Sequence, residues 1–373
     1  MAELKLAVID VKPGATMESQ SGLQMLRPRI YGAYAEPAGR RKVAAVIMHP
    51  TSNFMGHYLI QPLAERGICC MGLNSRYVNN DTVLLMERVI QDLGAGVKYL
   101  RDAGYEKVVL IGNSGGAALS SFYQAQAENL TAVRFAHGDP TGLSPEDLPP
   151  VDGIALCAAH EGRSRLFLNW LDPSVVDESD PLSADPEYDM FNPEHGPPYS
   201  TAFLEKFRAK QRQRRDRIEN WALARLRMLR SDPKGPQDQA FVVYRTLADP
   251  RCLDLSLDPN DREIGSVWGD ARKVNYAGNS MGRYTSLTAF LSQWSSRSQA
   301  DGPSNLANTS VPVLLATYTG DASTFPSTRD AWLQAAPGRI RNIDILGGNH
   351  YLAGQPEQVM EVADAIAVWA HGL

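Results

Sequence analysis

Short apolar runs alternate with segments of helical periodicity over the first 160 residues of the chain. The apolar runs lie at residues 4–11, 23–35, 43–48, 68–73, 107–111 and 151–159. The first two predict an antiparallel pair of strands, because Pro13-Gly14 punctuates the connection between them. The later runs are almost continuously apolar, which is typical of strands that are buried on both faces of a parallel sheet.

Helical segments separate these strands. Residues 55–66 predict a short helix that ends at Gly67. From Asp81, a favourable N-cap residue, apolar side chains recur with helical spacing as far as Leu100. Strands that alternate with helices imply right-handed crossovers. The pattern therefore predicts an α/β fold with a mostly parallel central sheet flanked by helices.

The pattern changes after residue 160. Long polar and proline-rich stretches and one strongly helical stretch follow, without an obvious run of buried strands. Strand character resumes at residues 311–317 and 341–346, and a final helix is expected at about 356–370. Structureless loops of this length are rare inside a compact domain. We therefore predict a core of residues 1–160 and 306–373, interrupted by a largely helical cap of residues 161–305 inserted between late core strands.

Composition changes this picture little. The chain has 373 residues, of which 43% are hydrophobic and 21% charged, which is ordinary for a globular protein with a large core. A net charge of −5 gives no general attraction to nucleic acid or to anionic membranes. No apolar run approaches 18 residues, so no membrane span is expected.

The cysteines and the N-terminal residues indicate in which cellular compartment the protein is expected. Cys69, Cys70, Cys157 and Cys252 are not spaced for zinc and are interpreted as reduced core thiols. The N-terminus has no long apolar core or small-residue cleavage site, so it is not interpreted as a signal peptide. A cytoplasmic protein is expected. A homo-oligomer is compatible with the sequence but is not indicated by it.

The segment around Ser114 carries the clearest chemical signal. Ser114 is the centre of a G-x-S-x-G pattern with Gly112 and Gly116, between an apolar run that ends at Ile111 and a helical segment that starts at Ala117. A sharp strand-to-helix turn strains its central residue, needs small neighbours and exposes the serine hydroxyl. The pattern predicts a serine nucleophile. A phosphate-binding loop would need different glycine spacing or a following Lys-Ser/Thr.

A serine nucleophile needs a base, and the base needs a carboxylate that orients it. Asp321 follows the strand that is expected to end at residue 317, and His350 directly follows the last expected strand. Both lie at the carboxyl ends of late strands, in the chain order serine, acid, histidine. His160 is the alternative base. Asp330 is the alternative acid, although it lies deeper in a predicted helix.

A second G-x-S-x-G pattern, Gly278-Asn-Ser-Met-Gly282, is centred on Ser280. The residues before it do not form an apolar run, so the strand that a nucleophile turn requires is missing. We interpret it as a cap loop with a helix after it.

Negative charge that develops on a substrate oxygen needs two aimed N–H donors. One is expected from Gly115, the residue after the nucleophile. The other is expected from Thr51 or Ser52 in the loop after the strand at 43–48, because Pro50 has no N–H.

Three further residues are candidates for the pocket. His49 is expected to brace the loop that carries the second donor, and His160 and Glu161 lie where the core meets the predicted cap. Residues 201–230 carry ten Lys or Arg against three acidic residues, a net charge of +7. Such a helix would receive an anionic substrate such as an acyl-CoA, or a partner surface, but a lid helix with a solvated basic face is the favoured interpretation.

These motifs together resemble the α/β-hydrolase superfamily. The resemblance rests on Gly112-Asn-Ser-Gly-Gly116 and Gly347-Gly-Asn-His350, in that order, and covers about residues 20–160 and 305–373. His49-Pro50-Thr51 is similar to the family's His-Gly-x oxyanion segment, with proline in place of glycine.

The resemblance implies the α/β-hydrolase fold and an acyl-enzyme route. Ser114 would attack a carbonyl, His350 would move the proton, Asp321 would orient His350, and water would complete the hydrolysis. No metal and no organic cofactor are implied.

The favoured hypothesis is a serine hydrolase that cleaves a carboxylic ester or lactone, because a large cap suits an enclosed site and a medium-sized apolar or aromatic small molecule. The same triad would serve a thioesterase, an amidase or peptidase, or a C–C bond hydrolase. A non-catalytic binding protein on the same fold is the alternative from another class. No nucleic-acid partner is expected.

Overall fold

The computed structural model describes residues 2–14, 27–39 and 41–373. Its centre is an eight-stranded sheet in the order β1-β2-β4-β3-β5-β6-β9-β10. The strands are β1 (Leu4–Asp10), β2 (Arg29–Ala35), β3 (Val43–His49), β4 (Ile68–Asn74), β5 (Lys107–Asn113), β6 (Gly153–Cys157), β9 (Val313–Tyr318) and β10 (Ile340–Ile345). Strand β2 is antiparallel to β1 and β4, and all other neighbours are parallel. The predicted, mostly parallel sheet is confirmed.

The part of the second predicted strand at residues 23–26 lies outside the described residues. The strand is described from Arg29, and β1 pairs with it in antiparallel register, with Leu4 opposite Ala35.

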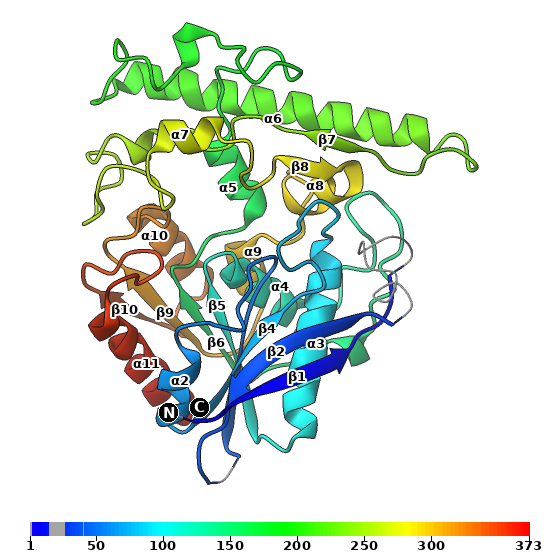
Figure 1. Ribbon diagram of the computed structural model, residues 1–373, viewed down its shortest axis with the longest axis vertical. Coiled ribbons are helices and arrows are strands. Elements are labelled where there is room, and N and C mark those ends of the chain that lie inside the picture. Colours follow the sequence, from blue (N-terminus) through cyan, green and yellow to red (C-terminus); the bar gives the residue numbers. More distant parts are fainter. Residues whose placement is uncertain (1, 15–26, 40) are drawn as a thin grey trace.

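Helices cover both faces of the sheet (Figure 1). They are α2 (Ile60–Glu65), α3 (Met86–Asp102), α4 (Gly116–Glu128), α9 (Gly302–Leu306), α10 (Pro326–Ala335) and α11 (Pro356–His371). Side chains of α2 and α11 join one apolar cluster with Ala45 and Ile47 of β3, whereas α3, α4, α9 and α10 join another with Val46 and Met48. Alternate residues of one strand thus enter two cores, which explains why the run at 43–48 is continuously apolar.

Helix α3 begins at Met86 rather than at Asp81, where the sequence predicts it. The reason is a tertiary contact. The side-chain amide of Gln293 donates to the carbonyl oxygens of Asp81 and Leu84, at 3.0 and 2.9 Å. Those carbonyls are therefore bound by a residue 209 positions from Leu84, instead of by N–H groups of a continuing helix.

Residues 158–312, between β6 and β9, form an insertion that lies over the carboxyl edge of the sheet (Figure 1). It contains α5 (Arg163–Trp170), α6 (Thr201–Leu229), α7 (Ala271–Tyr276) and α8 (Leu287–Gln293), and a two-stranded sheet of β7 (Ala240–Val242) and β8 (Tyr284–Ser286). Its apolar cluster includes Phe167, Ile218 and Trp294. Two of its helices contact the core: α9 packs against α4, and α8 packs against α3.

The basic residues of α6 mostly bind acceptors within the insertion. Arg214 is buried and pairs with Glu178 at 2.7 Å. Arg208 pairs with Asp249 at 2.9 Å. This helix therefore presents less free positive charge than its sequence indicates.

None of the described helices is long and apolar enough to cross a membrane. All four cysteines are buried free thiols, and burial raises the pKa of Cys157 and of Cys252 to about 12. Buried thiols of this kind are chemically inert.

Candidate active site

Ser114 directly follows β5 and has a positive φ of 55°. Its backbone N–H donates to the carbonyl of Cys157 at 3.0 Å, and its carbonyl accepts from the N–H of His160 at 3.2 Å. The strained conformation is therefore fixed by the end of β6 and the residues after it.

Gly112 and Gly116, on either side of Ser114, are required because other backbone atoms lie too close to leave room for a side chain. A Cβ atom at Gly112 would stand 2.6 Å from the Cα atom of Ala117, and one at Gly116 would stand 2.3 Å from the carbonyl oxygen of Met48. Neither neighbour is a flexible side-chain end, so no other residue fits. The predicted strand, turn and helix around Ser114 have the geometry of a nucleophile elbow.

The structure brings together the three residues that the sequence selects as nucleophile, base and acid. The Oγ atom of Ser114 lies 3.0 Å from Nε2 of His350, and Nδ1 of His350 lies 2.7 Å from Oδ2 of Asp321. A carboxylate can only accept, so Nδ1 of His350 donates to Asp321 and Nε2 accepts from the Ser114 hydroxyl. His350 is 4% and Asp321 0% exposed, so both groups are shielded from water.

Asp321 is held by its own loop. The N–H groups of Ser323 and Thr324 donate to Oδ1 at 2.7 and 3.2 Å, and the Thr324 hydroxyl donates to Oδ2 at 2.6 Å. Burial opposes ionisation of this carboxyl, but the His350 ring and the Thr324 hydroxyl outweigh it and hold the pKa of Asp321 below its ordinary value. The carboxyl therefore stays ionised beside His350.

The alternative base and acid lie elsewhere. Nε2 of His160 forms a hydrogen bond of 2.9 Å with Oγ of Ser323, and its ring centre lies 5.2 Å from that of His350. Burial lowers the pKa of His160 to about 3, so it is a neutral neighbour of His350. Asp330 is exposed on α10 and pairs with Arg329. Of the candidates, only His350 is hydrogen-bonded to Ser114.

The second G-x-S-x-G pattern lies in the connection between α7 and β8, without a strand ahead of it. Its Ser280 Oγ is buried and has no hydrogen-bond partner in the described part of the chain. The motif is therefore not a nucleophile elbow, although Asn279, Ser280 and Met281 line the same cleft as Ser114.

The loop after β3 differs from the expected oxyanion loop. The N–H groups of Thr51 and Ser52 both donate to Nδ1 of His49, at 3.1 and 2.9 Å. His49 braces the loop in this way, but both N–H groups are directed at its ring. Gly115 is the N-cap of α4, so its N–H lies ahead of the first helical turn and has no intrahelical acceptor.

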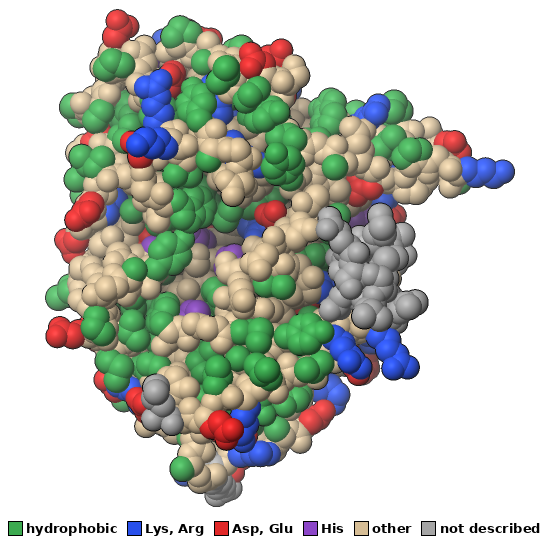
Figure 2. All heavy atoms as spheres, viewed as in Figure 1, with side chains coloured by type: hydrophobic (Ala, Val, Ile, Leu, Met, Phe, Trp, Pro, Cys, Tyr) green, Lys and Arg blue, Asp and Glu red, His purple; other side chains and the backbone are tan. Residues whose placement is uncertain are grey.

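Ser114 opens onto a cleft of ≈ 970 Å³ between the core and the insertion. Figure 2 shows the molecule hollowed here, with histidine atoms inside the hollow. Its lining includes His49, Ser52, Phe54, His57, Tyr58, Asn79, Asn113, Trp268, Asn279, Ser280 and Tyr351. A smaller cavity also reaches Ser114, and its lining combines polar side chains such as His160 and Ser323 with apolar ones such as Leu166 and Trp170.

The cleft is rich in uncharged polar groups. The side chains of Asn79 and Asn279 have no hydrogen-bond partner among the described residues. The single carboxylate of the lining, Asp81, lies 3.3 Å from Nη1 of Arg163. Glu161, a sequence candidate for the pocket, pairs with Arg165 at 2.7 Å and lines neither cavity.

One contact joins the insertion to Tyr351, the residue after His350. Nε1 of Trp268 donates to the hydroxyl oxygen of Tyr351 at 2.9 Å, and both side chains line the two cavities. The sequence gives no signal for this pair, because 83 residues separate its members.

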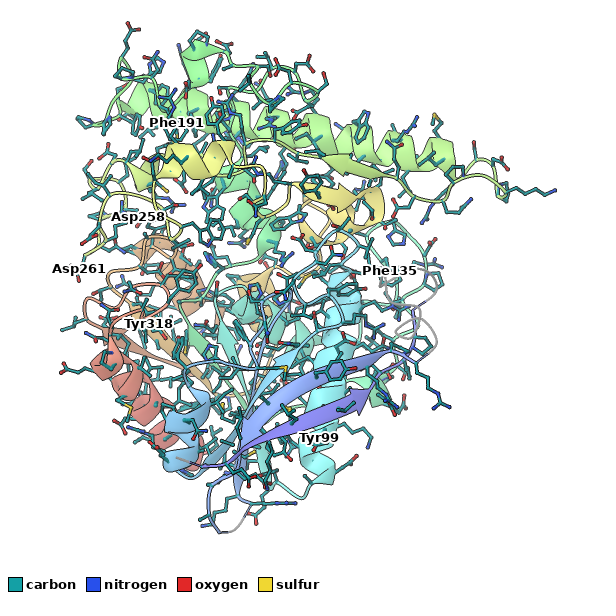
Figure 3. All side chains as sticks on the ribbon, viewed as in Figure 1. Tyr99, Phe135, Phe191, Asp258, Asp261 and Tyr318 are labelled. Atoms are coloured by element: carbon teal, nitrogen blue, oxygen red, sulfur yellow. The ribbon has the colours of Figure 1, made fainter. Side chains whose placement is uncertain are left out.

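A loop of the insertion binds the loop that carries Asp321. The side-chain amide of Asn260 donates to the backbone carbonyl of Asp321 at 2.8 Å, and the N–H of Asp261 donates to the carbonyl of Thr319 at 2.8 Å. In Figure 3, Asp258 and Asp261 lie where the insertion meets the core, near Tyr318 of β9. Sequence reasoning missed these residues, since a polar loop 61 residues from Asp321 carries no recognisable motif.

No group of three or more His, Cys, Asp or Glu side chains in residues 2–14, 27–39 and 41–373 is arranged to hold a metal ion.

No protein-family model and no curated protein matches this chain. Among solved structures, it is similar to that of DcsB in complex with its substrate analogue, with 12% identity, 99% of each chain covered and a TM-score of 0.52. A carboxyl esterase from Bacillus coagulans (10% identity, 100% of this chain and 99% of that one, TM-score 0.48) and an esterase domain from Rhodothermus marinus (12%, 99% and 98%, 0.47) match more loosely. Likeness at such identity shows a shared fold and nothing further.

Proposed function

We propose that this chain, which has the α/β-hydrolase fold, is a serine hydrolase that cleaves carboxylic esters or lactones through an acyl-enzyme on Ser114. The observation that carries the proposal is the continuous hydrogen-bonded chain from Ser114 through His350 to Asp321, at the floor of a cleft. Nucleophile, base and orienting acid in this arrangement are the parts that acyl transfer requires.

The hydrogen bonds support the following sequence of steps. Oγ of Ser114 attacks the substrate carbonyl carbon while Nε2 of His350 takes the hydroxyl proton. Asp321 holds Nδ1–H and stabilises the imidazolium that forms. His350 then gives the proton to the leaving oxygen as the C–O bond breaks. Water, deprotonated by the same nitrogen, releases the acid and restores Ser114.

We further propose that residues 161–305 act as a cap on a core of residues 1–160 and 306–373. The cleft lies between these two parts, and its walls come from both, through Phe54 of the core and Trp268 of the insertion. A substrate would therefore be enclosed by the insertion while Ser114 attacks it.

The cleft lining bears on the substrate. Aromatic side chains such as Phe54, Trp268 and Tyr351 line the cleft together with the amides of Asn79 and Asn279. This supports an uncharged, medium-sized small molecule that has an apolar or aromatic part, as expected from the sequence, and also hydrogen-bonding groups that the amides would bind. The smaller cavity beside Leu166 and Trp170 has ≈ 30 Å³ of space, enough for a methyl-sized group.

The alternatives fit less well. A CoA thioester would use the basic helix α6, but no residue of α6 lines either cavity that reaches Ser114. An amidase, a peptidase or a C–C bond hydrolase would use the same three residues, and no described residue favours one of them. A binding protein without activity would have no need for an aligned triad.

The test is intact mass after incubation with a fluorophosphonate, which forms a covalent adduct with an activated serine. Wild type and Ser280→Ala are expected to gain one adduct, and Ser114→Ala none. Ser280→Ala is the matched control, because its hydroxyl lines the same cleft within the same sequence pattern. A panel of esters, lactones, thioesters and amides then ranks the bond types.

An unmodified wild-type protein, with the probe active on a control hydrolase, would contradict the proposal. An adduct that survives in Ser114→Ala and disappears in Ser280→Ala would assign the wrong serine.

A further inference from the structure

The hydrogen bonds of His49 determine which of its ring nitrogens carries the proton. Nδ1 accepts from the N–H groups of Thr51 and Ser52, at 3.1 and 2.9 Å, and an accepting nitrogen holds a lone pair. Burial, followed by the nearby Arg163 and His160, lowers the pKa of His49 well below its ordinary value. The ring is therefore neutral, with its proton on Nε2.

The Nε2–H group of His49 faces the reaction centre. Nε2 lies 2.7 Å from the position that a Cβ atom on Gly115 would occupy, directly after the nucleophile. His49 and Ser114 line both cavities together. Among the described residues, no acceptor is hydrogen-bonded to Nε2. A donor without a protein acceptor thus lies beside Ser114.

Residues 50–52 of the loop after β3 offer no free backbone donor. The two N–H groups expected to act, those of Thr51 and Ser52, are directed at Nδ1, and Pro50 has none. The N–H of Gly115 supplies one donor. An oxyanion needs a second, and Nε2–H of His49 lies beside Gly115, 2.7 Å from the position of a Cβ atom on that residue.

We propose that Nε2–H of His49 is the second oxyanion donor, in place of a backbone N–H of the loop. The inference rests on the proposed function, because an oxyanion forms only if Ser114 attacks a carbonyl. His49 then has two roles at once: Nδ1 fixes the loop, and Nε2 binds the negative oxygen.

The step balances without proton transfer from His49. When Oγ of Ser114 bonds to the carbonyl carbon, the π electron pair moves onto the carbonyl oxygen, and the serine proton goes to His350. The oxyanion accepts hydrogen bonds from Gly115 N–H and His49 Nε2–H. Both donors keep their protons, and the bonds weaken again when the carbonyl re-forms.

Two substitutions of His49 distinguish the role of Nδ1 from that of Nε2. His49→Asn keeps an acceptor near the Nδ1 position and removes Nε2, whereas His49→Gln places an amide N–H near the Nε2 position. In His49→Asn we expect kcat to fall by about 100-fold to 1,000-fold, with KM nearly unchanged and thermal unfolding close to that of wild type. His49→Gln is expected to recover at least about tenfold of that loss. The rate of reaction with the fluorophosphonate should fall in parallel, because the adduct carries an oxygen in the same place.

A His49→Asn variant that is folded and keeps kcat within about threefold of wild type would overturn the inference. Nitrogen-15 NMR of histidine-labelled wild type gives a second test that needs no substrate and no folded variant of His49. The expected result is a His49 ring protonated at Nε2 alone, with the Nε2 proton shifted downfield in the fluorophosphonate adduct. A ring protonated at Nδ1 would overturn the inference even if Ser114 is labelled. A wild type that is not labelled at all would instead contradict the proposed function.

Discussion

The Nε2 atom of His49 lies 2.7 Å from the point where a Cβ atom of Gly115 would stand. Gly112 and Gly116 are fixed by backbone atoms, whereas Gly115 is fixed by a side chain. Glycine is therefore required at position 115 by the ring of His49, and not by the backbone of the turn.

Gly115→Ala should disable the site while leaving the fold intact. The added methyl group would displace the His49 ring, and with it the loop that Nδ1 holds. We expect kcat to fall at least about tenfold, since one donor would be misplaced. Gly278→Ala is the matched control, because a Cβ there meets nothing within 4 Å. Equal ester turnover by the two variants would show that the contact does not matter.

Asp321→Asn should leave the geometry nearly unchanged and reverse the polarity of the bond to His350. An amide N–H facing Nδ1 favours the tautomer with the proton on Nε2, which cannot accept the Ser114 proton. By analogy with other triads, kcat should fall about 10⁴-fold. Asp330→Asn, at the exposed alternative acid, should retain wild-type kcat. Steady-state kinetics of the two variants side by side decide which carboxylate acts.

His160 should make stability depend on pH. Burial lowers its pKa from 6.5 to about 3, so between these values the unfolded chain binds a proton that the folded chain does not. Stability is therefore complete above pH 6.5 and falls as the pH drops toward 3, by up to about 1.4 kcal/mol per unit from this group. In urea titrations at a series of pH values, the free energy of unfolding of His160→Gln should fall less steeply below pH 6.5 than that of wild type. Parallel curves would mean that His160 is already charged in the folded state.

Asn260→Ala should loosen the acid loop. The variant loses the 2.8 Å bond to the carbonyl of Asp321, which is worth about 1 kcal/mol of stability. We expect a several-fold lower kcat with KM almost unchanged, since Asp321 would hold His350 less firmly. Ser256→Ala removes a bond to Asp254 in the same part of the insertion, away from Asp321. A kcat that falls equally in both variants would mean that the effect is general destabilisation.

The central strands and the serine turn could be predicted because their signals are local. A run such as that of β3 must be apolar throughout when both faces are covered, and the turn at Ser114 needs glycine on either side. Asp321 and His350 were selected because each follows a late strand, in the chain order serine, acid, histidine. These features depend on neighbours along the chain, so a single sequence contains them.

The remaining features depend on where distant side chains point. The start of α3 is set by Gln293, and the N–H groups of Thr51 and Ser52 are taken by the ring of His49. The sequence predicted that His49 braces this loop, but it could not tell that the hydrogen bonds to His49 use the N–H groups expected to act as donors. Asn260 and Trp268 likewise contact the site through long-range hydrogen bonds, which the hydrophobic periodicity of the sequence does not predict.

The bonds from Asn260 and Asp261 to the loop of Asp321 also limit how this protein can be re-engineered. In many engineering schemes a peripheral segment is exchanged as a module to change substrate range, while the chemistry is left to the scaffold. In this protein, a replacement for the insertion would lack the side-chain amide of Asn260, which donates to the backbone carbonyl of Asp321. A functional chimera would therefore have to retain residues 258–261 of this chain together with its core.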